Sequence, residues 1–69
     1  MTNTLELKAA IVAAGYTIKE VSKKVGLSEY GFHKKLHNLS EFKASEIIML
    51  SDLLHLETSR RDQIFFAFL

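Results

Sequence analysis

The sequence predicts an all-α protein: a compact five-helix bundle whose second and third helices form a helix-turn-helix. Apolar residues recur at helical spacing along the 69 residues, and neither proline nor the alternating pattern of a half-buried strand occurs. In residues 17–38, two short helical patterns are separated by a glycine turn. A chain of this length has room for one core, so we expect residues 1–69 to form a single helix-turn-helix domain.

The first helix is expected close to the N-terminus, where one amphipathic pattern occurs. The residues with this spacing are Leu5, Leu7, Lys8, Ile11 and Val12. Gly15 can end this helix by adopting a positive φ. The second helix then begins at Thr17, which is spaced to form a capping box with Glu20. In such a box each side chain accepts a hydrogen bond from a backbone amide that the first turn leaves without a partner.

Gly26 separates the second helix from the third. Ser28 offers a side-chain oxygen to cap the third helix, which we expect to run to about Asn38, a residue suited to a left-handed exit. Apolar residues lie where two crossed helices would touch, namely Val21, Val25, Leu27, Phe32 and Leu36. A pair of helices with this pattern exposes the start of its second member, and DNA-binding proteins place that end in the major groove.

Two further helices are expected in the C-terminal half. After a loop at residues 39–42, in which Phe42 folds back onto the core, a strongly apolar helix runs from about Ala44 to Leu54. Its apolar residues are Ile47, Ile48, Leu50, Leu53 and Leu54. A last helix, capped by Thr58 or Ser59, then follows. It carries Ile64, Phe65 and Phe66.

The last residues of the sequence are strongly apolar, with Phe68 and Leu69 following the apolar part of the last helix. One helical face uses two or three such side chains in the core of its own domain. The remainder either forms a self-association surface, which would make a homodimer, or belongs to a last helix that is wedged deeper into the domain.

The composition excludes several classes of protein. The chain has no cysteine, hence no disulfide and no thiolate zinc site, which fits a reducing cytoplasm. No apolar run approaches the roughly 20 residues that span a bilayer. The N-terminal residues also lack a signal-peptide pattern. We therefore expect a soluble, cytoplasmic protein without a membrane partner.

Basic residues are concentrated in and around the helix-turn-helix. Residues 16–44 hold six lysines and three glutamates, a balance of +3. Residues 45–69 hold two arginines and four acidic residues, a balance of −2. A phosphate backbone would meet the basic segment. The excess is small, however, and a difference of this size is also typical of a solvated surface.

The segment TIKEVSKKVGLSEYGFHKKLHN, residues 17–38, resembles the helix-turn-helix of the Cro and phage-repressor (Xre) superfamily. The matching residues are Thr17, Glu20, Val21, Gly26, Leu27, Ser28, Phe32 and Leu36. With the following FKASEIIMLSDLLHL and RRDQIFFAFL, roughly residues 5–67 resemble small regulators of temperate phages of Gram-positive bacteria, in particular of the lactococcal type. The resemblance implies a regulator of the lysis/lysogeny switch in the cytoplasm of a bacterial host. Such regulators are either Cro-like DNA binders or modulators of repression (antirepressors).

The resemblance also implies which residues would read DNA. The exposed face of the third helix would carry Ser28, Glu29, Tyr30, His33, Lys34 and His37. Amides around Thr17 to Lys19, at the start of the second helix, would hold a phosphate. Further phosphate contacts would come from Lys19, Lys23 and Lys43. Lys34 would donate to guanine, and Glu29 would accept from a cytosine amino group.

Four positions depart from the DNA-binding pattern of this superfamily. Ile18 replaces a polar residue, often glutamine, and Ser22 replaces the usual alanine where the two helices cross. Glu29 places a negative charge at the leading tip of the third helix. Gly31 costs that helix about 0.5–1 kcal/mol relative to alanine. Both arginines of the chain lie far away in the last helix, whereas DNA readers commonly use arginine at base edges.

These departures favour a second function, the binding of a protein. A repressor of the same phage would present a basic DNA-reading face, and Ile18, Glu29 and Tyr30 would become interface residues that block it. Structural roles also explain each residue singly, because Tyr30 can cover the edge of the core, Ile18 can join the first two helices and Glu29 can stabilise a helix start. The antirepressor and the Cro-like operator binder therefore both stay open, with the antirepressor placed first.

An enzyme is not expected. His33 and His37 are spaced i, i+4, as two metal ligands on a helix would be, but no third ligand is evident. Ser28 and Glu29 lie too close to His33 on one short helix to form a catalytic triad with an oxyanion hole. We expect no catalytic residue, no metal site, no cofactor and no small-molecule substrate.

Overall fold

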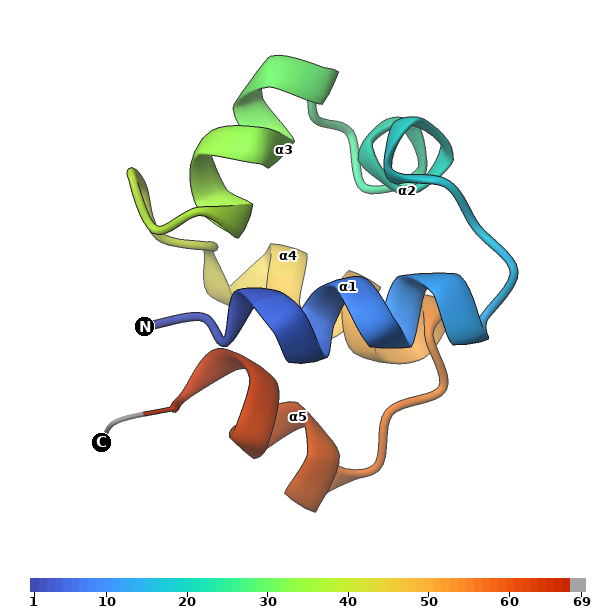
Figure 1. The fold of residues 1–69 in the computed structure, drawn as a ribbon, viewed down its shortest axis with the longest axis vertical. Helices are drawn as coiled ribbons and strands as arrows, with labels where there is room; N and C mark the ends of the chain where they lie inside the picture. Colours follow the sequence, from blue (N-terminus) through green and yellow to red (C-terminus); the bar gives the residue numbers. More distant parts are fainter. Residues whose placement is uncertain (68–69) are drawn as a thin grey trace.

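The computed structural model describes residues 1–67, which form five helices joined by short connections (Figure 1). The helices are α1 (Thr4–Ala13), α2 (Ile18–Lys24), α3 (Glu29–Leu36), α4 (Ala44–Leu53) and α5 (Thr58–Phe65). No strand occurs within this part of the chain. The prediction of an all-α protein with five helices is therefore confirmed.

The first four helices are each followed by one residue with positive φ, which turns the chain sharply. These residues are Gly15 (81°), Gly26 (78°), Asn38 (63°) and His55 (54°). The predicted exits at Gly15 and Asn38 are confirmed. His55 was not identified from the sequence, because glycine and asparagine are the residues that usually end a helix in this conformation.

Local capping explains where α2 and α3 begin. The side chain of Thr17 accepts a hydrogen bond from the Glu20 amide (3.1 Å), and the Glu20 carboxylate accepts one from the Thr17 amide (2.9 Å). Ser28 Oγ accepts a hydrogen bond from the Gly31 amide (3.0 Å). The predicted capping box and the predicted serine cap are therefore confirmed.

The predicted cap of the last helix is wrong. α5 begins at Thr58, so Glu57 occupies the N-cap position, and no side chain within residues 1–67 makes a capping hydrogen bond there. Neither Thr58 nor Ser59 serves as the cap because both lie inside the first turn. The helix is held instead by the buried side chains of Ile64 and Phe65 near its other end.

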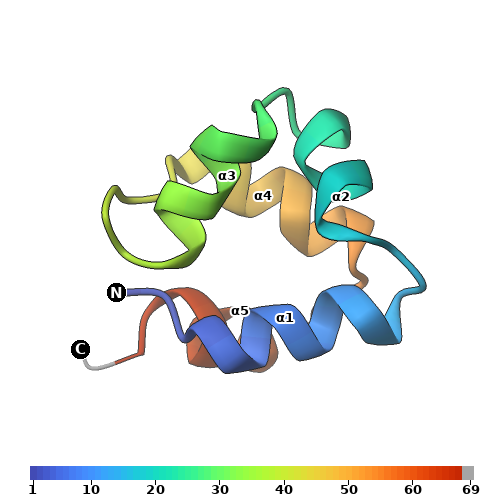
Figure 2. The ribbon, with the colours of Figure 1, turned by 45° about the horizontal axis from the view of Figure 1, so that its top comes forward.

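The helices are arranged around a single core. α2 packs against α3, and α1 packs against α5. Figure 1 shows α1 crossing the front of the molecule, with the α2–α3 pair on one side, α5 on the other and α4 behind. Figure 2 shows the same neighbours after rotation. Twelve residues contributed by all five helices and the α3–α4 loop form the core: Leu7, Ala10, Ile11, Val21, Val25, Phe32, Leu36, Phe42, Leu50, Leu54, Ile64 and Phe65.

Phe42 joins the two halves of this core. It lies in the loop between α3 and α4, and only 9% of it is exposed, as expected from the sequence. Its ring meets those of Phe32 and Phe65 edge to face, with 5.6 Å between ring centres in both cases. Such contacts add about 0.5–1.5 kcal/mol each to the burial of the rings. Phe42 therefore connects α3, the helix before its loop, to α5, which begins 16 residues later in the sequence.

Some apolar residues expected on inward faces lie on the surface instead. In α1 the exposed fractions are 78% for Leu5 and 74% for Val12, and in α4 the value is 61% for Ile48. The reason is geometric: α1 turns only the face with Leu7 and Ile11 toward the core, and the apolar residues on its opposite face have no helix to cover them.

Candidate functional site

The outer face of α3 gathers most of the residues predicted to contact DNA or a repressor. Phe32 and Leu36 point into the core, which leaves the other side of this eight-residue helix open to solvent. The predicted residues on this open side are Ser28, Glu29, Tyr30, His33, Lys34 and His37, and all six are exposed. α3 thus brings these side chains to one surface, which we call the α3 face.

Tyr30 is the largest exposed side chain of the α3 face, with 74% of its surface accessible. It therefore does not cover the edge of the core, which was the structural alternative for this residue. The Lys34 Nζ lies 5.6 Å from the centre of the Tyr30 ring, a cation–π contact that joins consecutive turns of the helix. The two side chains together make an amphipathic spot near the start of α3.

His33 and His37 continue the α3 face toward its C-terminal end. Their rings are parallel to within 4°, with centres 6.0 Å apart. Within the described residues, no group of three or more histidine, aspartate or glutamate side chains is placed to hold a metal ion. The arrangement thus extends the aromatic character of the face from Tyr30 to the end of the helix.

The start of α2 carries a carboxylate where a phosphate contact was expected. The Thr17 amide donates to Glu20 Oε1, and this hydrogen bond, together with the one to the Thr17 hydroxyl, lowers the pKa of Glu20. Glu20 is therefore ionised at neutral pH, beside the helix start. This carboxylate lies next to the amides around Thr17 to Lys19 that were expected to hold a phosphate, and that expectation stays a prediction.

The remaining predicted residues of α2 divide into buried and exposed ones. Ile18 is half-buried and packs against the core. Ser22 is buried where α2 meets its neighbours, and its hydroxyl donates to the Ile18 carbonyl (2.7 Å), so this polar group is satisfied. Lys19 and Lys23 are exposed and lie free of the core.

Gly31 has a local reason to be glycine. A Cβ added at this position would lie 3.0 Å from the Oγ of Ser28, the atom that caps α3. The glycine therefore leaves room for the capping hydroxyl, which accepts a hydrogen bond from the same residue's amide. Glycine at this position avoids that close approach, whereas the Thr17 cap of α2 accommodates Glu20, which has a Cβ, at the corresponding position.

A buried ion pair fixes the inner flank of α3 and was not identified from the sequence. Lys35 Nζ lies 2.6 Å from Glu46 Oε1 of α4, and their side chains are only 12% and 8% exposed. The same carboxylate oxygen accepts a hydrogen bond from the Lys43 amide (2.8 Å). Lys43 thus contributes its backbone to this pair, while its side chain remains exposed.

The electrostatics of Glu46 follow from these contacts. Burial by itself would raise the pKa of this carboxyl, but the hydrogen bonds from Lys35 and from the Lys43 amide outweigh burial and lower the pKa. Glu46 is therefore ionised at neutral pH. The bond to the Lys43 amide had a sequence signal, because Glu46 lies three residues after Lys43, the N-cap of α4. Its partner on α3 could not be read from any spacing.

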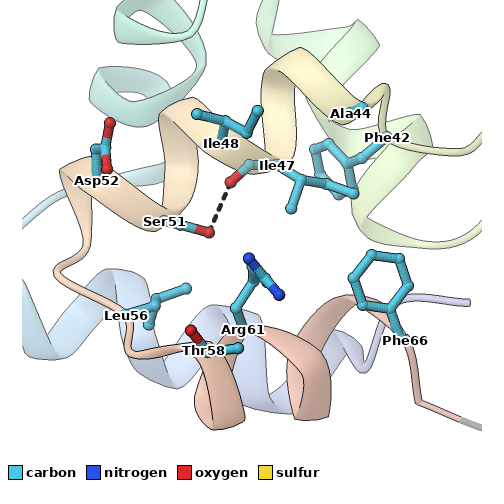
Figure 3. Close-up of a pocket in the computed structure, with 10 residues that line it drawn as sticks. All are labelled: Phe42, Ala44, Ile47, Ile48, Ser51, Asp52, Leu56, Thr58, Arg61 and Phe66. Carbon is cyan, nitrogen blue, oxygen red and sulfur yellow. Dashed lines mark hydrogen bonds between the residues drawn. The ribbon is translucent and has the colours of Figure 1, made fainter.

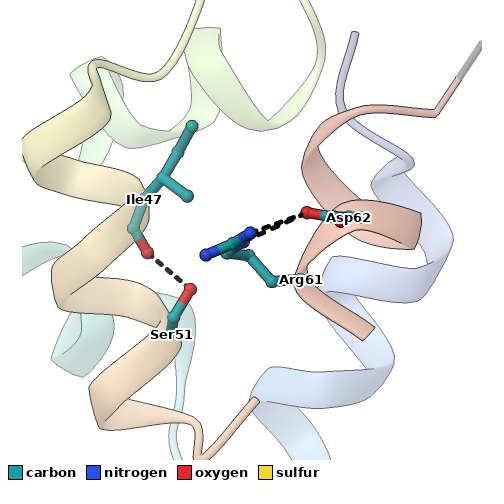
Figure 4. Close-up of polar contacts among 4 residues, drawn as sticks. All are labelled: Ile47, Ser51, Arg61 and Asp62. Carbon is teal, nitrogen blue, oxygen red and sulfur yellow. Dashed lines mark hydrogen bonds and ion pairs between the residues drawn. The ribbon is translucent and has the colours of Figure 1, made fainter. Parts of the chain in front are cut away.

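Apart from the α3 face, a hollow lies between α4 and α5 (Figure 3). This hollow of about 600 Å³ is apolar at one end, where Phe42, Ile47 and Phe66 lie. Arg61 projects into it from α5 toward Ser51. Figure 4 shows that the Arg61 guanidinium is held by the adjacent Asp62, at 3.0 and 3.1 Å, while the Ser51 hydroxyl donates to the Ile47 carbonyl (2.7 Å). Asp52 and Thr58 also line this hollow.

The residues proposed for self-association, Phe68 and Leu69, lie outside the described residues. Phe66, just before them, is 40% exposed and lines the hollow between α4 and α5. The self-association prediction stays a prediction.

Comparison with protein-family models, with curated proteins and with solved structures gives no match for this chain. Within residues 1–67, no helix is both long and apolar enough to cross a membrane.

Proposed function

We propose that this protein is a small phage-type regulator of the lysis/lysogeny switch that acts as an antirepressor. In this proposal the α2–α3 pair is a helix-turn-helix whose α3 face docks onto the DNA-binding domain of the phage's main repressor. Docking there competes with operator DNA and relieves repression. The protein binds a macromolecule and has no catalytic role.

One observation carries the choice of a protein partner over DNA: α3, the docking helix, begins with an exposed glutamate. Glu29 is the first residue of α3 and departs from the pattern of the DNA-binding superfamily. The start of this helix is the part of a helix-turn-helix that enters the groove between the phosphates. Carboxylates repel phosphates but complement the basic surface of a protein that itself binds DNA.

The composition of the α3 face agrees with a protein partner. Protein interfaces are anchored by exposed aromatic residues, and Tyr30 is the most exposed aromatic side chain described. His33 and His37 add aromatic surface beside it. The face has no arginine, the residue most often used to read guanine.

A Cro-like repressor that binds operator DNA through α3 is the alternative. The exposed lysines favour it, since Lys19, Lys23 and Lys34 lie on α2 and α3 without a carboxylate partner among the salt bridges of residues 1–67. Lys34 is held over the Tyr30 ring, within reach of a base edge or a phosphate.

The two proposals predict opposite effects of one charge reversal, Glu29→Lys. We would titrate the protein against two probes: the DNA-binding domain of the repressor encoded beside its gene, and a labelled duplex from upstream of its own gene. An antirepressor should bind the repressor domain, and Glu29→Lys should weaken that affinity about tenfold, because the lysine would face a basic surface.

A DNA binder should behave in the reverse way. It should bind the duplex more tightly than scrambled DNA, with an affinity that falls steeply with salt, and Glu29→Lys should strengthen that binding. Glu57→Lys is the matched control, because it makes the same charge change at the start of α5, away from α3 (Figure 1). Binding of the operator duplex alone, with no affinity for the repressor domain, would reject the antirepressor.

A further inference from the structure

The C-terminal end of α3 is held by residues 2–4, which lie at and just before the start of α1. The side-chain amide of Asn38 makes two hydrogen bonds to the backbone of Thr2: Oδ1 accepts from the Thr2 amide (2.8 Å), and Nδ2 donates to the Thr2 carbonyl (2.9 Å). Thr4 Oγ1 donates to the carbonyl of Leu36, the last residue of α3 (2.7 Å). The partners are 32 and 36 residues apart in the sequence, so these contacts exist only in the folded protein.

The same segment is fixed on its other side. The amide of Asn3 donates to the carbonyl of Ile64 in α5 (2.7 Å). Thr2, between the contacts, is only 7% exposed. The N-terminal segment is therefore tied to α5 as well as to α3, so it has a fixed base from which to hold the end of α3.

Asn38 combines two properties that this contact needs. Its φ of 63° lies in the left-handed region, which asparagine tolerates better than most residues other than glycine. Its short amide also supplies one donor and one acceptor side by side, which matches the N–H and C=O of a single backbone residue. Glycine would satisfy the backbone alone and would lose both hydrogen bonds.

We propose that residues 2–4 form a strap that positions the C-terminal turn of α3, with Asn38 as the positioning residue. The effect of the strap on binding rests on the proposed function, in which α3 is the docking helix. The strap as a structural contact does not depend on that function. α3 has eight residues, too few for a stable helix without external contacts. Ser28 caps its first turn, Phe32 and Leu36 anchor it to the core, and the strap holds the backbone at the end that carries His37.

The test compares Asn38→Gly with His55→Gly in the full chain. Asn38→Gly removes the two side-chain hydrogen bonds to Thr2 but keeps the left-handed backbone conformation available. His55→Gly makes the same kind of change at the other non-glycine residue with positive φ, whose side chain makes no hydrogen bond within residues 1–67. Hydrogen exchange of individual amides, measured by NMR, is the first readout. The second is affinity for the repressor domain named above.

We expect Asn38→Gly to accelerate exchange of the amides that close the last turn of α3, those of His37 and Leu39, by about tenfold or more. The amides of Val21 and Val25 in α2 should change much less. Affinity for the repressor domain should fall, and Thr4→Val should act in the same direction. Asn38→Asp, which keeps the acceptor for the Thr2 amide but lacks the donor, should recover part of both effects. His55→Gly should change neither quantity.

Three results would overturn the strap. The first is unchanged exchange at the end of α3 in Asn38→Gly. The second is an equal acceleration in all helices, which would mean a general loss of stability. The third is a local acceleration without any loss of affinity, which would remove the positioning role. If the unaltered protein does not bind the repressor domain at all, the proposed function fails while the exchange measurement still decides whether the strap holds α3.

Discussion

The two ends of α3 are held by different kinds of contact. At the N-terminal end, Ser28 caps a helix that begins at the next residue, so the contact spans three positions. At the C-terminal end, Asn38 and Lys35 reach residues 36 positions before and 11 positions after them. The first end depends on local sequence and the second on the whole fold. A change at the second end should therefore cost more stability.

The largest effect is expected from breaking the buried pair at the flank of α3. Lys35→Met leaves the Glu46 carboxylate buried without its charged partner, which costs about 3–5 kcal/mol. A chain of 69 residues has a total free energy of unfolding of about 3–10 kcal/mol, so much of this variant should be unfolded. Urea denaturation followed by circular dichroism measures the difference.

A double variant serves as the control for this pair. Lys35→Met with Glu46→Gln removes both charges and keeps an oxygen that can accept from the Lys43 amide. It should recover most of the stability lost in Lys35→Met. A cost below about 1 kcal/mol in the single variant would mean that the pair behaves like one on an open surface.

The pH dependence of stability tests the contribution of the buried Glu46, near the C-terminal end of α3, and of Glu20 at the start of α2. The pKa values of Glu46 and Glu20 are lowered in the folded protein from their usual 4.5, so the unfolded chain binds protons first as the pH falls. Their stabilising contribution is complete above this value and is lost as the pH falls through the lower, folded pKa. Chemical denaturation at several pH values should show constant stability near neutral pH and a decline below about pH 4.5.

Glu46→Gln tests which carboxylate dominates this decline. The variant should be less stable near neutral pH, and its stability should fall less steeply in acid. An acid profile that is identical to that of the unaltered protein would assign the decline to other carboxylates.

The smallest effects are expected at the N-terminal end of α3. Ser28→Ala removes one capping hydrogen bond and should cost about 1 kcal/mol. Gly31→Ala should change stability little, because the gain in helix propensity is offset by the close approach of its Cβ to Ser28 Oγ. In the Ser28→Ala background the same change should stabilise by about 0.5–1 kcal/mol. Thermal unfolding of the four proteins measures this coupling, and additive effects would contradict the steric explanation.

The features of the fold that depend on neighbouring residues were predictable from the sequence. The capping box of Thr17 and Glu20, the Ser28 cap and the exit at Asn38 involve residues within a few positions of each other, and all three are confirmed. The cap of α5 was predicted wrongly, because threonine or serine near a helix start does not fix which residue is the first.

The contacts between distant segments were not predictable. Helical spacing places Leu5 and Val12 on a helix but does not say which face meets the core, and both are exposed. Lys35 was counted only as part of the basic segment, because no spacing connects it with Glu46. For the candidate site, the sequence identified the residues that share the α3 face. It did not show that Ile18 is half-buried while Tyr30 stands clear of the core.

The turns between the helices have a kinetic consequence. Each of the four sharp exits uses Gly15, Gly26, Asn38 or His55, and the sequence contains no proline. Refolding therefore has no prolyl isomerisation step, which would otherwise take about 10–100 s at 25 °C. Such a chain can regain its fold on the much shorter time scale of helix formation and collapse, because no X–Pro peptide bond has to isomerise first.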